Sequence, residues 1–238
     1  MLEALYFAAV LFAAYFVRGL AGFGSGLIAV PLLTLVAPLT LVVPLVVLLD
    51  YVGSASQGLR NSARIAWREQ LVQVPFMLVG VAVGLHLLTA VPRQWLARSL
   101  GAFVILYALY QLLALPPLRG SRGFATVCGF FGGLVGTVFG TGGPFYVVYF
   151  NLRALDRIAF RATFAVNFLI DGGVRLVAYL VTGLLGWATL PFLAIGLPFA
   201  AAGLYLGGRI QTGFTQASFV RVVGALLVVS GIMLLLKR

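Results

Sequence analysis

Two stretches of this chain are strongly apolar yet hold too many glycines for a continuous helix. The tetrad Phe23-Gly24-Ser25-Gly26 returns as Phe139-Gly140-Thr141-Gly142, at a spacing of 116 residues (139 − 23 = 116). Glycine adopts backbone conformations that are closed to other residues, so each stretch is predicted to break into two helical pieces. Paired glycine-broken segments at corresponding positions of two halves are typical of the substrate site of a repeat-built membrane transporter.

The composition requires lipid as the solvent for most of the chain. The 238 residues are 62% hydrophobic and 9% charged, with a mean hydropathy of +1.11. A soluble domain of this size cannot hide so much apolar surface. The net charge of +11 comes almost wholly from arginines between the apolar runs. Because cytoplasmic loops have this pattern, we expect no nucleic-acid partner.

Motifs for catalysis, cofactors and metals are missing from the sequence. Cys128 and His86 each stand alone, so we expect no disulfide and no metal site. The sequence has no Gly-x-x-x-x-Gly-Lys-Ser/Thr phosphate loop, and Gly22-Phe23-Gly24 lacks the third glycine of a dinucleotide fingerprint. No nucleophile lies beside a candidate base. We therefore expect no cofactor, no catalytic residue and no enzymatic activity.

Eight apolar stretches divide the chain. Six of them are continuous runs of about 20 residues, long enough to cross a bilayer: they lie near 39–59, 70–90, 95–115, 162–182, 188–208 and 218–236. The two glycine-broken stretches cover about 4–37 and 124–152, and polar turns at 60–69, 116–123 and 151–161 separate the runs.

A second set of matches supports an internal duplication. Four residues of the first half recur at a spacing of 123 (203 − 80 = 123), namely Gly80, Gly84, Arg98 and Gly101 as Gly203, Gly207, Arg221 and Gly224. The small-xxx-small spacing of Gly80 and Gly84 is typical of close helix packing. We predict one integral membrane domain built from two repeats, residues 1–116 and 123–238.

The distribution of basic residues favours an inverted arrangement of the repeats. Eight full crossings would divide these residues evenly between the two sides of the membrane. If each glycine-broken stretch is instead a hairpin that returns to its own side, ten arginines share one side and four basic residues the other, as the positive-inside rule requires. The ten are Arg60, Arg64, Arg68, Arg119, Arg122, Arg153, Arg157, Arg161, Arg209 and Arg221, and the four are Arg93, Arg98, Lys237 and Arg238. The predicted fold is an all-α polytopic membrane protein with two inverted repeats, each a glycine-broken helical hairpin plus three transmembrane helices.

The hairpin tips are the predicted anion site. A helix that restarts after a break presents free N–H groups and the positive end of its dipole, and both attract anions. Pro144 suits the first turn of such a helix, and Arg18 directly precedes the first glycine cluster. We expect the anion between the two tips, where backbone N–H groups, hydroxyls and this arginine would bind it. The predicted tip residues are Arg18, Gly24, Ser25, Gly26, Gly140, Thr141, Gly142 and Gly143.

Polar residues inside the apolar runs complete the predicted site, because ionisable groups in lipid are costly and usually functional. The first set, spaced four apart on one predicted helix face, is Asn167, Asp171, Arg175 and Tyr179; the second, on the corresponding helix of the first half, is Asp50, Ser54 and Gln57. Asn167 and Arg175 are expected to bind the anion, and the others to line the site or couple it to protons. Two alternatives remain open: Asp171 and Arg175 neutralise each other as an ion pair, and Asp50 pairs with an arginine across the bundle.

The order and twofold recurrence of these motifs resemble the sulfite exporter TauE/SafE family of permeases. The residues that carry the resemblance are Gly22-Phe23-Gly24-Ser25-Gly26 with Pro31, Gly140-Thr141-Gly142-Gly143-Pro144, and the pairs Gly80/Gly84 and Gly203/Gly207. The resemblance extends over about residues 5–236 and implies a multi-pass protein of the bacterial inner membrane that moves sulfite, organosulfonates or related sulfur oxyanions.

The predicted function is secondary transport of small sulfur-containing or organic anions by alternating access. The expected partners are a small anionic substrate and the lipid bilayer. Proton coupling and homo-oligomer formation stay open, as do two alternative functions, a passive anion channel and a non-transporting membrane scaffold protein.

Overall fold

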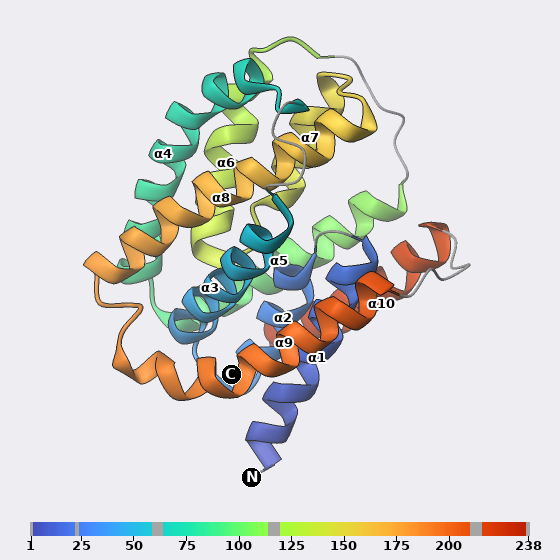
Figure 1. Cartoon of the computed structure of the whole chain (residues 1–238). Coiled ribbons are helices and arrows are strands. Elements are labelled where there is room, and N and C mark those ends of the chain that lie inside the picture. The colour runs from blue at the N-terminus through green and yellow to red at the C-terminus, as the bar shows by residue number, and fades with distance from the viewer. Residues whose placement is uncertain (1, 22–23, 59–63, 114–119, 210–215, 237–238) are drawn as a thin grey trace. The chain divides into compact units, whose positions relative to one another are not determined.

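The computed structural model describes residues 2–21, 24–58, 64–113, 120–209 and 216–236, and all regular structure in these ranges is helical (Figure 1). The helices are α1 (Leu2–Ala21), α2 (Ser25–Thr34), α3 (Leu39–Gly58), α4 (Trp67–Ala90), α5 (Arg93–Leu112), α6 (Phe124–Phe139), α7 (Gly143–Leu152), α8 (Arg157–Val181), the short 3₁₀ helix η2 (Trp187–Thr189), α9 (Leu190–Arg209) and α10 (Gln216–Leu236). The six continuous apolar runs correspond to α3, α4, α5, α8, α9 and α10, which confirms that these runs form helices.

Both glycine-broken stretches form two helices each. The break falls at Gly24 (φ 100°) between α1 and α2, and at Gly140 (φ 69°) between α6 and α7. These left-handed conformations strain any residue with a Cβ, which is why glycine stands there. Of the first tetrad, Phe23 and the preceding Gly22 lie outside the described residues.

Four described helices are long and apolar enough to cross a membrane. Their apolar segments are Glu3–Leu20, Trp67–Ala90, Ile158–Val181 and Leu190–Arg209. In contrast, α2 and α7 have 10 residues each, or about 15 Å at 1.5 Å per residue. That is about half of a hydrocarbon core of about 30 Å, so neither can cross it.

The chain divides into two compact units. The first contains Met1–Val46, Val91–Pro116 and Trp187–Arg238, and the second contains Val47–Ala90 and Pro117–Gly186. Each unit draws helices from both predicted repeats, so the units are not the repeats themselves. The division into repeats at 1–116 and 123–238 stays a prediction.

In the first unit, α1 packs closely against α9 and also forms a hairpin with α2. A Cβ on Gly203 would overlap the carbonyl oxygen of Phe12, and one on Gly207 would overlap that of Phe16. The two glycines therefore let the α9 backbone approach α1 directly. At the other end of α2, Tyr6 Oη donates to the Leu32 carbonyl (3.0 Å), which joins the early part of α1 to the end of α2.

Neighbouring glycines of α9 give a matched test of this packing. A Cβ on Gly207 would lie 3.0 Å from the Phe16 carbonyl carbon, whereas one on Gly208 would meet nothing within 4 Å. We expect Gly207→Ala to lower the stability by about 1–3 kcal/mol through overpacking, a decrease in Tm of roughly 2–12 °C. Gly208→Ala should leave Tm unchanged or slightly raised, because alanine is the better helix former. Equal Tm values for the two purified variants would contradict the close α1–α9 contact.

In the second unit, α4 packs against α6 through the same kind of contact. A Cβ on Gly80 would overlap the carbonyl oxygen of Phe130, and one on Gly84 would lie 2.8 Å from that of Leu134. The predicted packing role of Gly80 and Gly84 is confirmed by these approaches. Gly129 lies against Gln73 and Gly133 against Met77, so α4 and α6 run in the same direction.

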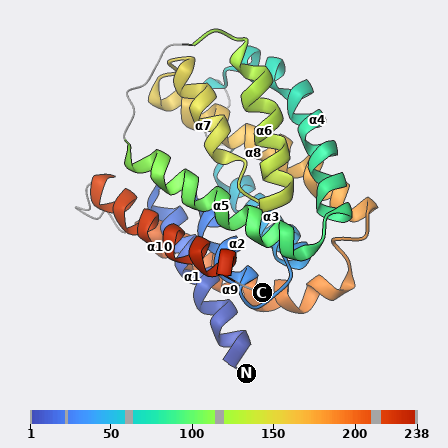
Figure 2. The ribbon, with the colours of Figure 1, turned by 180° about the vertical axis from the view of Figure 1, so that it is seen from behind.

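The helices α6 and α7 form a hairpin whose two ends meet (Figure 2). The amide of Gly120, before α6, donates to the carbonyl of Leu152, the last residue of α7 (3.0 Å). The start of α6 and the end of α7 therefore lie side by side. The third long helix of this unit, α8, begins with Asp156 as its N-cap, which accepts bonds from the amides of Ile158 and Ala159 (2.9 Å each). These bonds hold the pKa of the Asp156 carboxyl below its ordinary value.

Candidate functional site

The polar stripe of α8 is buried, as the four-residue spacing predicts for residues on one face. Asn167, Asp171 and Tyr179 are 0% exposed and Arg175 is 2% exposed. Asp171 and Arg175 form a buried ion pair, which confirms the predicted alternative that they neutralise each other. A buried arginine and carboxylate in an apolar helix are costly, which makes this pair a candidate for a functional role.

The Arg175 guanidinium lies against the tip of the α6–α7 hairpin. Its Nη1 donates to the carbonyl of Gly136 (2.8 Å), its Nη2 to the Asp171 carboxylate and its Nε to the Asp171 carbonyl (3.4 Å). A Cβ on Gly136 would lie 3.3 Å from Arg175 Cζ and 3.4 Å from the Cα of Gly142. Gly136 thus leaves room for the guanidinium beside the break.

The tip itself offers polar groups that the protein leaves unused. Thr141 is 4% exposed, and its Oγ1 has no hydrogen-bond partner among the described residues. The first residues of α7 are Gly143 and Pro144, and its N-cap, Gly142, supplies no side-chain cap. Pro144 has no N–H and the Phe145 amide donates to the Gly142 carbonyl (3.2 Å), so the Gly143 amide and the positive end of the helix dipole are what attract negative charge at this end of α7.

Tyr146, one turn into α7, extends the polar surroundings of Asp171. Its ring lies against Gly132 of α6, and its side chain is fully buried. The Tyr146 hydroxyl interacts electrostatically with Asp171 but has no partner in hydrogen-bonding geometry. Tyr179 Oη donates to the Thr137 carbonyl (2.7 Å) and so ties α8 to the last turn of α6.

This arrangement has the chemistry of an oxyanion site. A guanidinium has five N–H groups, so the three bonds that Arg175 makes leave donors for a ligand. The Thr141 hydroxyl and the start of α7 add neutral donors next to it. In this unit the structure brings together five of the predicted residues: Gly140, Thr141, Gly142, Asp171 and Arg175. It also places Gly143 at the start of α7, with the Phe168 ring in contact.

The first hairpin, in the other unit, gathers the remaining predicted tip residues. Arg18 is in the last turn of α1, is 5% exposed, and donates from Nη1 to Ser25 Oγ (3.3 Å). Its guanidinium also lies 5.8 Å from the centre of the Tyr15 ring. Gly24 and Gly26 flank Ser25 at the start of α2. The prediction that Arg18 lies beside the first glycine cluster is confirmed.

The predicted residues of α3, Asp50, Ser54 and Gln57, lie on one helix. Asp50 (6% exposed) and Ser54 (5% exposed) are buried, and Tyr51 between them lies against Gly172 of α8. Gln57 is in the last turn of α3, and its side chain lies outside the described residues. The role of these three residues in coupling or lining stays a prediction.

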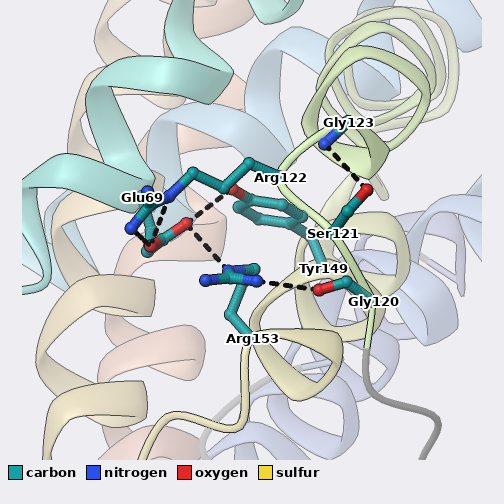
Figure 3. Close-up of polar contacts among 7 residues, drawn as sticks. All are labelled: Glu69, Gly120, Ser121, Arg122, Gly123, Tyr149 and Arg153. Carbon is teal, nitrogen blue, oxygen red and sulfur yellow. Dashed lines mark hydrogen bonds and ion pairs between the residues drawn. The ribbon is translucent and has the colours of Figure 1, made fainter.

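A cluster at the open end of the α6–α7 hairpin was not predicted (Figure 3). Glu69, in the first turn of α4, accepts bonds on Oε1 from Nε and Nη2 of Arg122 (3.0 and 2.9 Å). On Oε2 it accepts bonds from Tyr149 Oη (2.8 Å) and Arg153 Nε (3.1 Å). Arg153 Nη1 also donates to the carbonyl of Gly120 (2.8 Å). The bond from Glu69 raises the pKa of the Arg122 guanidinium above its ordinary value.

Sequence reasoning also missed two glutamines of α4, Gln70 and Gln73, which are 0% and 1% exposed. Gln70 Nε2 donates to Asn167 Oδ1 (2.9 Å). The sequence did indicate these residues, because both glutamines are polar side chains inside an apolar run, as Asp50 is. No group of His, Cys, Asp and Glu residues in the described part of the chain has the arrangement of a metal site.

The sequence matches the family described as Sulfite exporter TauE/SafE over residues 6–234. It is 26% identical over 198 residues to the probable inner membrane transporter protein TsaS of Comamonas testosteroni, covering 80% of this chain and 81% of that protein. It is 28% identical over 236 residues to the probable sulfite/organosulfonate exporter TauE of Cupriavidus necator, covering 96% of this chain and 92% of that protein. No solved structure matches this chain.

Proposed function

The chain belongs to the sulfite exporter TauE/SafE family, and from this premise we propose that it moves small sulfur-containing or organic anions by alternating access. Membership makes the chain a multi-pass inner-membrane transporter rather than an enzyme. The named relatives are a probable inner membrane transporter and a probable sulfite/organosulfonate exporter. Sulfite and organosulfonates are therefore the first substrates to test.

The observation that carries the proposal is the buried Arg175 guanidinium at the tip of the α6–α7 hairpin. It lies beside Gly136 and Gly142, with the unpartnered Thr141 hydroxyl and the start of α7 close along the chain. A sulfonate or sulfite presents several oxygens, which match a guanidinium and converging N–H and O–H donors. We propose that Arg175, Thr141, Gly142 and Gly143 bind the anion in this unit, with Asn167 farther along the stripe. Arg18, Gly24, Ser25 and Gly26 are the proposed counterpart at the other tip.

We propose that the two repeats are related by an inverted twofold symmetry. Two pairings support this relation: α1 packs on α9 in one unit through Gly203 and Gly207, and α6 packs on α4 in the other through Gly80 and Gly84. Each pair joins a helix of one repeat to a helix of the other. The α7 helix has 10 residues, or about 15 Å, too short for a full crossing, which favours a re-entrant α6–α7 hairpin over two full crossings. Three crossings per repeat would then invert the second repeat, as alternating access between inverted repeats requires.

Proton coupling has a proposed site at Asp171. This carboxylate engages Arg175, and it also interacts with Tyr146 of α7 and Tyr179 of α8; Tyr51 of α3 lies against the adjacent Gly172. A proton on Asp171 would release the guanidinium from its counter-charge and strengthen its hold on an anion. In this scheme Asp50 and Ser54 line the path of the proton to Asp171, and one proton accompanies each anion.

Transport by purified protein in proteoliposomes tests the proposed function. We expect saturable uptake of radiolabelled sulfite or an organosulfonate such as taurine or sulfoacetate, with carboxylates as weaker competitors. Uptake should respond to an imposed pH gradient. Flux that rises linearly with concentration would identify a passive channel instead. A chain with neither flux nor a Tm shift with any of these anions would be a scaffold, and the proposal would fail.

A further inference from the structure

Three buried carboxamides lie between α4 and α8, and two of them, Gln70 and Gln73, are outside the proposed anion site. We name Gln70, Gln73 and Asn167 the amide seam. All three are at most 1% exposed. One bond joins Gln70 to Asn167, but Gln70 Oε1, both amide atoms of Gln73 and Asn167 Nδ2 have no hydrogen-bond partner among the described residues.

Polar atoms that have neither a protein partner nor water to bond with raise the free energy of the folded state. A buried polar group that loses water and gains no partner destabilises the fold, and native proteins satisfy nearly all such groups with protein, water or ligand. Polar side chains with spare donors and acceptors are suitable partners for ordered water. We infer that the amide seam is hydrated and is the route by which the anion reaches Arg175 from the end of the unit where Glu69 lies.

The contacts of α4 place the seam between these two points. Ala66 N donates to Thr163 Oγ1 (2.8 Å), and four residues farther along both helices Gln70 meets Asn167. The two helices therefore run in the same direction here. From Asn167 the polar face of α8 continues at four-residue intervals to Asp171 and Arg175.

The neighbouring helix α6 follows the same path. Gln73 lies against Gly129, the next turn holds Gly132 against the Tyr146 ring, and one turn later Gly136 contacts Arg175. The Tyr146 ring thus lies one turn of α6 beyond Gly129, and its hydroxyl interacts with Asp171. Polar groups follow one another from the first turns of α4 to the hairpin tip.

The chemistry of the seam suits passage rather than tight binding. Carboxamides donate to sulfonate or sulfite oxygens without a full charge, and transport requires binding strong enough to enter yet weak enough to leave. At its Glu69 end, two guanidiniums, of Arg122 and Arg153, face a single carboxylate. This excess of positive charge attracts anions to the start of the route. The role as an anion route rests on the proposed function, whereas the hydration of the seam does not.

Cysteine labelling tests the inference, and the chain is suited to it because Cys128 is its one cysteine. In a Cys128→Ala background, Gln73→Cys and Asn167→Cys are exposed to 2-sulfonatoethyl methanethiosulfonate, itself a small sulfonate that reacts with thiols in water. The control is Met77→Cys, one turn beyond Gln73 on α4 and 0% exposed. We expect the two seam cysteines to react at least tenfold faster than the control. Taurine or sulfoacetate should slow them at least threefold.

The other outcomes of the labelling experiment distinguish the hydration of the seam from its role as the anion route. Labelling no faster than at Met77→Cys would overturn the hydrated seam, even if anions still shift the Tm of the native chain and so support the proposed function. Fast labelling that no anion slows would overturn the route.

A second variant gives an independent measurement in the native chain. Gln73→Met keeps the length of the side chain and removes its amide, so we expect an unchanged or higher Tm with at least fivefold slower anion uptake. A lower Tm would show that the Gln73 amide is structural and would overturn the inference.

Discussion

The double variant Asp171→Asn with Arg175→Gln is expected to fold normally and to lose anion binding. Removing Arg175 alone would leave the Asp171 carboxylate buried without its counter-charge, at a cost of about 3–5 kcal/mol. Removing both charges avoids that cost, and isosteric neutral pairs are often as stable as the ion pair they replace. Loss of the charge-assisted bonds from Arg175 should weaken binding by about 2–4 kcal/mol, or roughly 30- to 1,000-fold in Kd. Isothermal titration of the purified variant with the anion that best stabilises the native chain measures this change.

Single variants show how the two charges contribute. In Asp171→Asn the guanidinium keeps its bond to the Gly136 carbonyl and loses its counter-charge, so anion binding should become tighter and independent of pH. Arg175→Lys keeps the charge but not the fork of N–H donors, and it should bind at least tenfold more weakly than the native chain. A double variant that is folded, as judged by Tm, and binds with native affinity would remove Arg175 from the site.

The positions of the helices could be predicted from the sequence because they depend on local patterns. A run of about 20 apolar residues forms a helix in lipid whatever it packs against, and six such runs correspond to α3, α4, α5, α8, α9 and α10. The breaks at Gly24 and Gly140 also follow from a local property, the positive φ that glycine permits. In the same way, four-residue spacing predicted that Asn167, Asp171 and Arg175 share one face of a helix, and in α8 all three are buried.

The partners of these residues could not be predicted, because they lie far apart in the chain. Gln70 and Asn167 are 97 residues apart, and Glu69 meets Arg153 across 84 residues. Nothing in a single sequence pairs such positions. The sequence places Glu69 at the end of a polar turn that separates two apolar runs, and nothing there indicates that its carboxylate accepts four hydrogen bonds from the two ends of the hairpin. The meeting of the two hairpin tips stays a prediction from the sequence.

Neutralising Glu69 is expected to loosen the α6–α7 hairpin. Glu69 uses both carboxylate oxygens as acceptors, for Arg122 on one side and for Tyr149 and Arg153 on the other. In Glu69→Gln one oxygen becomes an NH₂ group, which faces donors and cannot accept. Since Glu69 is 6% exposed, losing these bonds should cost about 2 kcal/mol, or roughly 4–8 °C in Tm for a chain of this size. Arg68→Gln is the matched control, because Arg68 is the exposed neighbour on the same helix and the substitution also removes one charge.

Hydrogen exchange at individual sites shows whether Glu69 restrains the α6–α7 hairpin or whether its replacement destabilises the whole protein. Glu69 bonds to residues just before α6 and at the end of α7, so hydrogen exchange should accelerate at least tenfold at 120–124 and 152–155 in Glu69→Gln. Exchange in α9, in the other unit, should be unaffected. Because the hairpin positions Gly136 and Gly142 beside Arg175, anion affinity should fall as well, by about threefold or more. Unchanged exchange at the hairpin ends, with native affinity, would mean that α6 and α7 hold their position through packing alone and that the Glu69 bonds do not restrain them.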